Sequence, residues 1–145
     1  MVRAGVSAAA RDLGNIHSIS PTHRQKRSMK TLLKAEYTAL LLIGIFAFHQ
    51  TGISWWWFLA FFFMPDISML CYAAGNRVGA VSYNIFHHFA SGVLCFVLGK
   101  YLNIHNLEVA GIILFTHSAF DRILGYGLKF PDSFHNTHLG RIGKA

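Results

Sequence analysis

The sequence predicts an all-α membrane protein in which four transmembrane helices form an antiparallel bundle. Of the 145 residues, 53% are hydrophobic, 14% are aromatic and only 13% are charged, whereas an ordinary soluble domain is about 25% charged. So short a chain cannot cover this much apolar surface with so few polar residues, because small domains expose much of their area. The composition therefore excludes a soluble globular domain.

Four apolar segments are long enough to cross a bilayer, which needs about 20 residues of helix. They cover residues 31–50, 53–72, 78–100 and 107–128. The connections between them are short, and short connections between long helices join antiparallel neighbours. An open sheet is excluded, because its unpaired backbone groups would be costly in lipid. We therefore expect a four-span bundle over residues 31–128.

Both ends of the chain are polar. Residues 1–30, rich in Arg, Ser and Ala, are expected to form a disordered basic tail. Alternatively, residues 1–28 are an over-extension of the reading frame, with Met29 as the start. Residues 129–145 are expected to form a short cytoplasmic tail, either solvated or lying as a flap over the cytoplasmic mouth of the bundle. Only two cysteines occur, both in apolar runs, so no disulfide framework is expected.

The distribution of positive charge orients the predicted bundle. Twelve of the thirteen Lys and Arg residues fall on the side of the two termini, and only Lys100 falls on the other. Because cytoplasmic loops carry the excess of Lys and Arg, we expect a multi-pass protein of the inner membrane with both termini in the cytoplasm. The net charge of +7 forms no face on a folded domain, which excludes nucleic acid as a partner. The lipid bilayer is the expected partner.

Polar side chains from all four helices are expected to meet in the cytoplasmic half of the bundle. At about 1.5 Å of rise per residue, they lie roughly 8–16 Å from the cytoplasmic surface, whereas the outer half is nearly all apolar. Charged groups that face lipid are costly, so these should turn inward and pair. Pro65 should break the second helix there, and one pair is spaced i, i+4 and can touch. The candidate catalytic residues are Glu36, Asp66, His87, His117 and Asp121.

The third apolar segment carries a polar stripe. Asn84, one of the adjacent His87 and His88, and Ser91 have the spacing of one helical face. Only one of the two adjacent histidines can point to the bundle axis. This stripe should complete the polar site from the side of the third helix.

Two cations near the end of the fourth segment are candidates for binding an anionic group of a substrate. They are Arg122 and Lys129. Arg122 lies about 100° around the helix from Asp121, so it could instead extend to the inner headgroups. A third alternative is that Arg122 pairs with Glu36 or Asp66.

The sequence assigns no cofactor and no metal ligand. Nine histidines invite comparison with di-iron membrane desaturases, but neither the H-x-x-x-H nor the H-x-x-H-H pattern occurs. A mixed carboxylate and imidazole site remains chemically feasible, because these ligands suit iron, manganese or zinc. Its ligands would come from the candidate catalytic residues.

Three classes of function fit these observations. The first is an acid–base enzyme, or binder, for a lipophilic small molecule, since such chemistry needs groups with displaced pKa values. The second is a proton-coupled transporter acting as a homo-oligomer, and the third is a structural protein whose polar cluster ties helices together. The outer half offers a transporter few polar groups, so the first class is favoured.

From Lys30 onward, the chain resembles a family of small bacterial integral membrane proteins known as domain of unknown function 4260. The matching stretches are LLKAEYTALLL, MPDISMLCYAAGNRVGAVSYNIFHH, THSAFDRILGYGLKF and FHNTHLGRIGK. The resemblance implies a multi-span membrane fold and favours His87 over His88, but it implies no activity. Together with the polar stripe and the two cations, it gives the candidate substrate-binding residues Tyr72, Asn84, Arg122, Tyr126, Lys129, His138 and Arg141.

Overall fold

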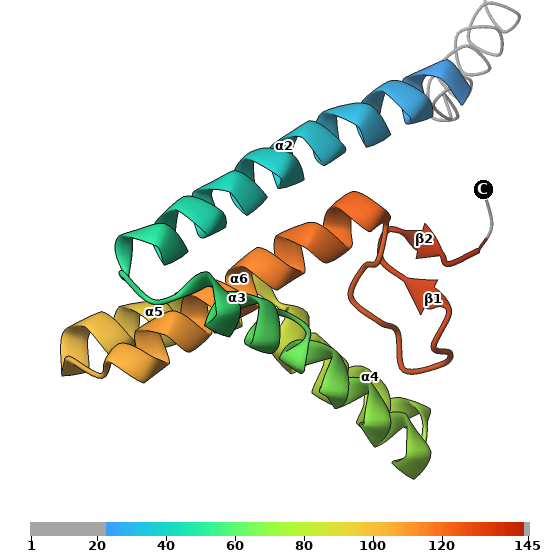
Figure 1. Ribbon diagram of the computed structural model, residues 1–145. Coiled ribbons are helices and arrows are strands. Elements are labelled where there is room, and N and C mark those ends of the chain that lie inside the picture. The colour runs from blue at the N-terminus through green and yellow to red at the C-terminus, as the bar shows by residue number, and fades with distance from the viewer. Residues whose placement is uncertain (1–22, 144–145) are drawn as a thin grey trace, which may run out of the picture. The chain divides into compact units, whose positions relative to one another are not determined.

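Helices account for most of residues 23–143, the part of the chain that the computed structural model describes (Figure 1). The all-α expectation is thus confirmed for these residues. Residues 33–145 form one compact unit, and the part of the first helix before Leu33 falls in another. In chain order the elements are α2 (His23–Gln50), α3 (Trp55–Phe62), the 3₁₀ helix η2 (Met64–Ala74), α4 (Asn76–His87), α5 (Phe89–Leu102), α6 (His105–Leu124), β1 (Asn136–Thr137) and β2 (Gly140–Arg141).

The first helix starts earlier than expected. α2 begins at His23, so residues 23–30, expected to be disordered, are helical. The run has no proline and little glycine to stop a helix from extending backwards from the apolar segment. The rest of the expected basic tail, residues 1–22, lies outside the described residues.

Two stretches are long and apolar enough to cross a membrane: residues 27–50 of α2 and residues 55–74 of α3 with η2. A third is obtained when α4 and α5, which meet at a 50° bend, are counted as one span. α6 is long enough but is not among these stretches, because it carries three charged residues, Glu108 near its start and Asp121 and Arg122 near its end. Two or three of the four expected spans are therefore recognisable from helix length and hydropathy.

The second predicted segment changes helix type at its proline. α3 ends at Phe62, and η2 follows with Pro65 in its first turn. A proline has no N–H to donate and clashes with the preceding turn of an α-helix, so the chain tightens into a 3₁₀ helix at this point. The expected break beside Asp66 is confirmed.

The third predicted segment is broken at His88. This residue has an extended backbone, with φ −92° and ψ 128°, between the end of α4 and the start of α5. Its ring Nδ1 accepts a hydrogen bond of 3.1 Å from the N–H of Ala90 and so caps α5. Because of this break, Ser91 lies on α5 and does not continue the helical face of Asn84 and His87, contrary to the predicted stripe.

α5 and α6 approach each other through glycines. A Cβ atom added to Gly111 of α6 would lie 2.3 Å from the backbone nitrogen of Phe96, and one added to Gly99 of α5 would lie 2.3 Å from that of Glu108. Small residues let helix backbones come this close in lipid. A similar approach joins α2 to α6, where a Cβ on Gly44 would clash with the side chain of Thr116.

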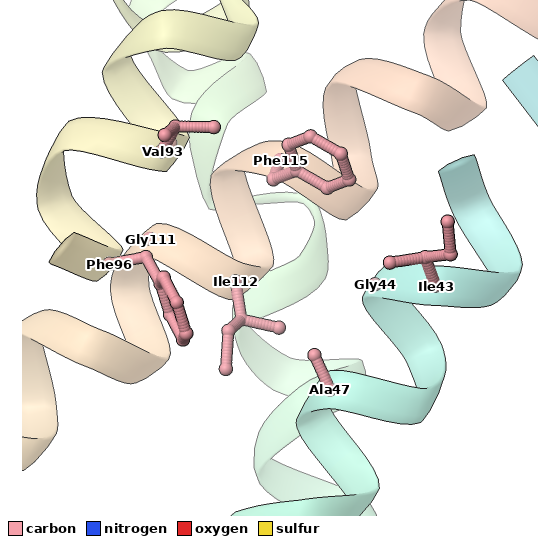
Figure 2. A pocket seen from close by; sticks show the side chains of 9 residues that line it. Ile43, Gly44, Ala47, Val93, Phe96, Gly111, Ile112 and Phe115 are labelled. Carbon is pink, nitrogen blue, oxygen red and sulfur yellow. The ribbon is translucent and has the colours of Figure 1, made fainter. Parts of the chain in front are cut away.

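An apolar groove runs between α2, α5 and α6 (Figure 2). Its accessible space is about 230 Å³, and it is lined by apolar residues together with Gly44, Gly92 and Gly111. Next to it, aromatic and aliphatic side chains from α2, α3 and α6 form the buried core: Phe48, Phe58, Phe62, Val109, Ile112 and Ile113.

The C-terminal segment is folded. β1 and β2 form a small antiparallel hairpin, and Thr137 also bridges back to Lys129. The side chain of Asn84 on α4 holds this segment, because its Nδ2 donates to the carbonyl of Lys129 at 2.9 Å and its Oδ1 accepts from the Lys129 N–H at 2.7 Å. Residues 129–143 therefore lie against the helices as an ordered strap, whereas a position over the cytoplasmic mouth of the bundle stays a prediction.

Candidate functional site

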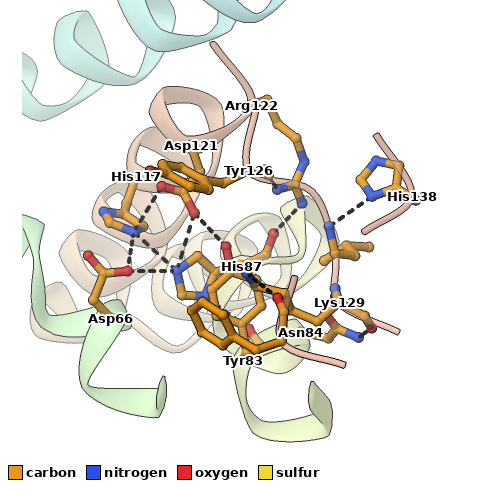
Figure 3. A network of polar contacts seen from close by, with 12 residues as sticks. Asp66, Tyr83, Asn84, His87, His117, Asp121, Arg122, Tyr126, Lys129 and His138 are labelled. Atoms are coloured by element: carbon orange, nitrogen blue, oxygen red, sulfur yellow. Dashed lines mark hydrogen bonds and ion pairs between the residues drawn. The ribbon is translucent and has the colours of Figure 1, made fainter. Parts of the chain in front are cut away.

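Two histidines and two aspartates converge in the interior of the unit (Figure 3). The Nε2 atoms of His87 and His117 are 3.1 Å apart. Asp66 Oδ1 lies 3.3 Å from the first of these nitrogens and 3.4 Å from the second. Asp121 faces them from the other side, with Oδ2 3.6 Å from His87 Nε2 and Oδ1 3.8 Å from His117 Nε2. We call these four residues the His–Asp cluster.

Each member reaches the cluster because of a local feature of the chain. The proline at the start of η2 places Asp66 in the first turn of that helix. His87 is the last residue of α4, directly before the break. His117 and Asp121 lie one turn apart on α6, so their side chains share a face. The prediction that these four residues meet is confirmed.

The cluster is closed on most sides and open at one. The side chains of His87 and His117 are 0% and 1% exposed, and that of Asp121 is 8% exposed. The side chain of Asp66, in contrast, is 35% exposed. Access to the cluster from outside therefore leads past Asp66.

Tyr83 supports two members of the cluster. Its hydroxyl donates to Asp121 Oδ2 at 2.6 Å, and its backbone carbonyl accepts from the ring Nδ1–H of His87 at 2.9 Å. The Tyr83 and His87 rings also stack, with centroids 3.7 Å apart. Because Nδ1 carries the proton that it donates, the neutral His87 ring presents a lone pair on Nε2 to the cluster.

Tyr83 was not among the predicted site residues. It lies one helical turn before His87, and the i, i+4 spacing places both on one face. That spacing could have identified it from the sequence.

The Arg122 side chain is buried and bonded to the backbone. Its guanidinium donates to the carbonyl of His87 at 3.0 Å and to the carbonyl of Tyr126 at 2.6 Å. The first of these bonds satisfies a carbonyl that the break after α4 leaves without a helical partner. The expectations that Arg122 extends to headgroups or pairs with Glu36 or Asp66 are wrong.

Lys129 is also held by local acceptors. Its ammonium donates to the carbonyl of Phe134 at 3.0 Å and lies 3.9 Å from the centre of the Phe134 ring and 5.0 Å from that of Tyr83. Burial lowers the pKa of Lys129 below its ordinary value. Arg122 and Lys129 thus flank the cluster, and both donate to backbone carbonyls of the chain.

The strap carries the next candidate residues. His138 Nδ1 accepts from the N–H of Leu128 at 2.8 Å, and burial together with the nearby Arg122 charge lowers the pKa of His138. Tyr126 contributes its backbone carbonyl to Arg122, whereas its side chain is exposed. Arg141 is exposed on β2. None of these three residues is part of the cluster.

Two further predicted residues lie elsewhere. Glu36 is exposed on α2 and is not part of the cluster, contrary to the prediction. Tyr72 packs its ring against Phe134, with centroids 5.1 Å apart, and its buried hydroxyl has no hydrogen-bond partner among the described residues. His88, the alternative to His87, is exposed and caps α5.

The cluster has the composition of a site that exchanges protons or binds a metal ion. Imidazole nitrogens take up and release protons near neutral pH, and a carboxylate beside the ring orients it. The same four groups offer two nitrogen and two oxygen ligands, and these atoms all lie within 4.8 Å of one another. Either chemistry would take place in surroundings largely closed to water.

Fold and cluster together define a class: a helical protein with apolar outer faces and a buried His–Asp cluster at a helix break. The family comparison is more specific. The model of a domain of unknown function, DUF4260, matches residues 30–142, so the chain belongs to this family. No curated protein and no solved structure matches the chain.

Proposed function

We propose that the chain is an integral membrane protein with four spans and both termini in the cytoplasm of a bacterial cell. α2, α3 with η2, α4 with α5, and α6 would supply the spans. The outward faces support this, since Trp56, Leu70 and Val81 are 77%, 74% and 58% exposed and surfaces this apolar are rare on soluble monomers. Asn76, at the start of α4, donates a hydrogen bond to the Asp132 carbonyl of the strap, so the start of α4 and the strap lie close together. Four spans require these two segments to be on the same side of the membrane.

Within this protein, the His–Asp cluster would be the reactive centre of an enzyme that moves protons on a lipophilic substrate. The observation that carries this proposal is the close approach of two buried imidazoles, the buried carboxylate of Asp121 and the partly exposed carboxylate of Asp66, drawn from three helices. Ionisable groups inside a membrane protein are costly and mark functional sites by default. If the cluster served only for packing, apolar side chains of similar volume could replace it at little cost in stability.

The surroundings of Asp66 favour a lipophilic substrate. This carboxylate is the accessible member of the cluster, and its neighbours along the chain, Phe63, Met64 and Ile67, are 57%, 50% and 56% exposed. An opening bordered by such side chains faces acyl chains rather than water. A molecule dissolved in the bilayer could reach the cluster along this side.

The contacts suggest a role for each member. Asp121, fixed by Tyr83, would orient the two rings, and one of the ring nitrogens would accept the proton of the substrate. Asp66, at the opening, would return a proton or hold the reacting group. Arg122 and Lys129 would position the chain around the site, since their donors are occupied by backbone carbonyls.

The enzyme proposal is tested with Asp121→Asn and His117→Ala in the full chain. The substrate is unknown, so the readout is untargeted lipid mass spectrometry of bacterial cells that express each protein at matched membrane levels. We expect lipid species that change with the wild-type protein and return to the empty-vector pattern with either variant. His105→Ala is the control, because His105 is exposed at the start of α6, and it should behave like the wild type.

Two other outcomes would count against an enzyme. If both variants fail to accumulate in the membrane while His105→Ala accumulates, the cluster is needed to hold the helices together. This result would favour the alternative of a structural protein over an enzyme. If both accumulate and no lipid species depends on the protein, the enzyme proposal is wrong. Proton flux in liposomes that is lost in Asp121→Asn would then favour the transporter alternative.

A further inference from the structure

We propose that the His–Asp cluster binds one divalent transition-metal ion, of the zinc class, through His87 Nε2, His117 Nε2, Asp66 and Asp121. This deepens the proposed function, on which it rests for the role of the site. With the ion bound, the two Nε2 atoms are ligands and no longer the proton acceptors suggested above. Metal binding can be measured without knowing any substrate. Imidazole and carboxylate together suit zinc, iron and manganese.

The spacing of the ligand atoms fits a single ion. Four atoms that each lie 2.0–2.2 Å from a tetrahedral zinc ion stand about 3.3–3.6 Å from one another. The two Nε2 atoms are 3.1 Å apart, and they lie 3.3–3.8 Å from the carboxylate oxygens, with Asp66 approaching both through Oδ1 and Asp121 approaching His87 through Oδ2 and His117 through Oδ1. All four ligand groups lie within 4.8 Å of one another, so small side-chain movements would bring them to the spacing that such an ion requires.

The direction of the lone pairs points to a cation between them. His87 donates its Nδ1–H to the Tyr83 carbonyl, so its neutral ring aims the Nε2 lone pair at two carboxylates. His117 Nδ1 is buried and has no hydrogen-bond partner among the described residues. Without a cation, the Nε2–H of His117 would donate to His87 Nε2 at 3.1 Å, and a bound ion would replace this proton between the two nitrogens. Lone pairs that face each other repel unless a positive charge lies between them.

The charge of the cluster calls for the same cation. Two ionised carboxylates carry a charge of −2 in a site of low dielectric, where unpaired charge is costly. Within residues 23–143, neither Arg122 nor Lys129 lies within ion-pair distance of Asp66 or Asp121, so both cations act on these carboxylates only from farther away. One divalent ion with two neutral imidazoles would make the site neutral.

The hydrogen bonds that the proposed ligands make with other groups of the protein also fit a metal site. Metal-binding histidines usually donate the second ring nitrogen to a carbonyl or carboxylate, and metal-binding carboxylates are themselves hydrogen-bonded. His87 and Asp121 both meet this rule through Tyr83. The partial exposure of Asp66 leaves one side of the ion open, as in sites where a further ligand or substrate joins the metal.

The test uses the full chain, purified in mild detergent with a tag that contains no histidine and without chelators. We expect about one zinc, iron or manganese ion per chain by plasma mass spectrometry, as for a dedicated site. His87→Asn should lose this metal, whereas His88→Asn should keep it, because His88 is exposed and asparagine can still cap α5. The two variants make the same substitution at neighbouring positions.

A second measurement does not depend on how well the variants fold. A chelator should lower the melting temperature of the wild-type protein, and added Zn²⁺ should restore it, because a ligand that binds only the folded state stabilises it. Added Co²⁺ should give the strong visible absorption of a tetrahedral site with nitrogen and oxygen ligands, and Zn²⁺ should abolish it.

The proposal is overturned if wild-type protein carries no more metal than His87→Asn and Zn²⁺ leaves its melting temperature unchanged. A histidinium would then supply the positive charge of the cluster. Failure of the enzyme proposal looks different: the metal is bound and lost in His87→Asn, yet no lipid species depends on the protein. Lipid changes that depend on the wild-type protein although it carries no more metal than His87→Asn would instead retain the enzyme proposal and reject the metal site.

Discussion

At the scale of single residues, the position of an ionisable residue along its helix predicted which side chains come together. It did not predict which face of the helix each side chain lies on. Asp66, His87, His117 and Asp121 were expected at one level of the bundle, and they converge. Ionisable side chains in an apolar helix have few options, because lipid excludes them and they pair with one another. This constraint can be read from the sequence alone.

For Glu36, the position along the helix did not predict whether the side chain joins the cluster. It was expected at the level of the cluster, but the face of α2 that packs inward carries Tyr37, Gly44 and Phe48. Glu36 is rotated by about 100° from Tyr37 around the helix, which leaves it exposed. Helix rotation depends on the neighbouring helices, and a single sequence does not specify those.

Replacing Tyr83 with phenylalanine tests the support of Asp121. The substitution removes a 2.6 Å hydrogen bond to a buried carboxylate and leaves the ring that stacks on His87. A hydrogen bond to a charged group contributes about 1.5–3 kcal/mol, so Tyr83→Phe should lower the free energy of unfolding by about that amount. Reversible denaturant unfolding in detergent, followed by tryptophan fluorescence, measures the change.

Tyr101→Phe is the matched control for this hydroxyl deletion. Tyr101 is 81% exposed, so removing its hydroxyl should change the free energy of unfolding by less than about 0.5 kcal/mol. Equal effects of the two variants would mean that the bond from Tyr83 to Asp121 contributes nothing to stability.

At the scale of elements, the two helix breaks differ in how visible they are in the sequence. The change from α3 to η2 can be predicted from Pro65, because proline cannot continue an α-helix. The break at His88 has neither proline nor glycine beside it. It depends on contacts far along the chain: Arg122 binds the last carbonyl of α4, and Asn84 holds the strap. Tertiary contacts of this kind leave no local pattern.

The pairing of α5 with α6 depends on glycine contacts, which gives an element-scale prediction. Gly111→Val places a branched side chain where a single Cβ would already lie 2.3 Å from the Phe96 nitrogen. The helices must separate, and overpacking of this kind costs about 1–3 kcal/mol. We expect a lower melting temperature in detergent and less protein in the membrane fraction.

Ala110→Val, one residue earlier on α6, provides the comparison. Ala110 is exposed, so the same β-branched side chain meets no backbone there. Its effect should stay within about 0.5 kcal/mol. If the two valine variants are equally stable, the close approach of α5 and α6 is not required by the fold.

At the scale of the whole molecule, composition predicted helices and an apolar exterior, but the number of spans depends on α6. Its 20 residues include Glu108, Asp121 and Arg122, which lower its hydropathy. In the folded unit, Glu108 pairs with Lys100 at 2.7 Å, Asp121 faces the cluster and Arg122 binds backbone carbonyls. Each of the three charged side chains therefore contacts polar groups of the protein, so the composition of α6 remains compatible with the proposed fourth span.

The number of spans can be tested with single cysteines. In a chain whose own cysteines are replaced (Cys71→Ser, Cys95→Ser), one cysteine is placed at Gln50, Ala74, Asn106 or His135, all exposed at helix ends or in the strap. Intact cells are treated with a membrane-impermeant maleimide, and opened cells serve as the control for reactivity. Four spans predict labelling of intact cells at positions 50 and 106 only.

The cysteine at His135 decides between three spans and four, because it alone follows α6. If α6 crosses the membrane, this position shares a side with position 74, and both are labelled only in opened cells. With three spans, position 135 would instead be labelled in intact cells together with positions 50 and 106. That pattern would put the strap on the side opposite to the start of α4 and contradict the hydrogen bond from Asn76 to Asp132, so the proposed topology would be wrong.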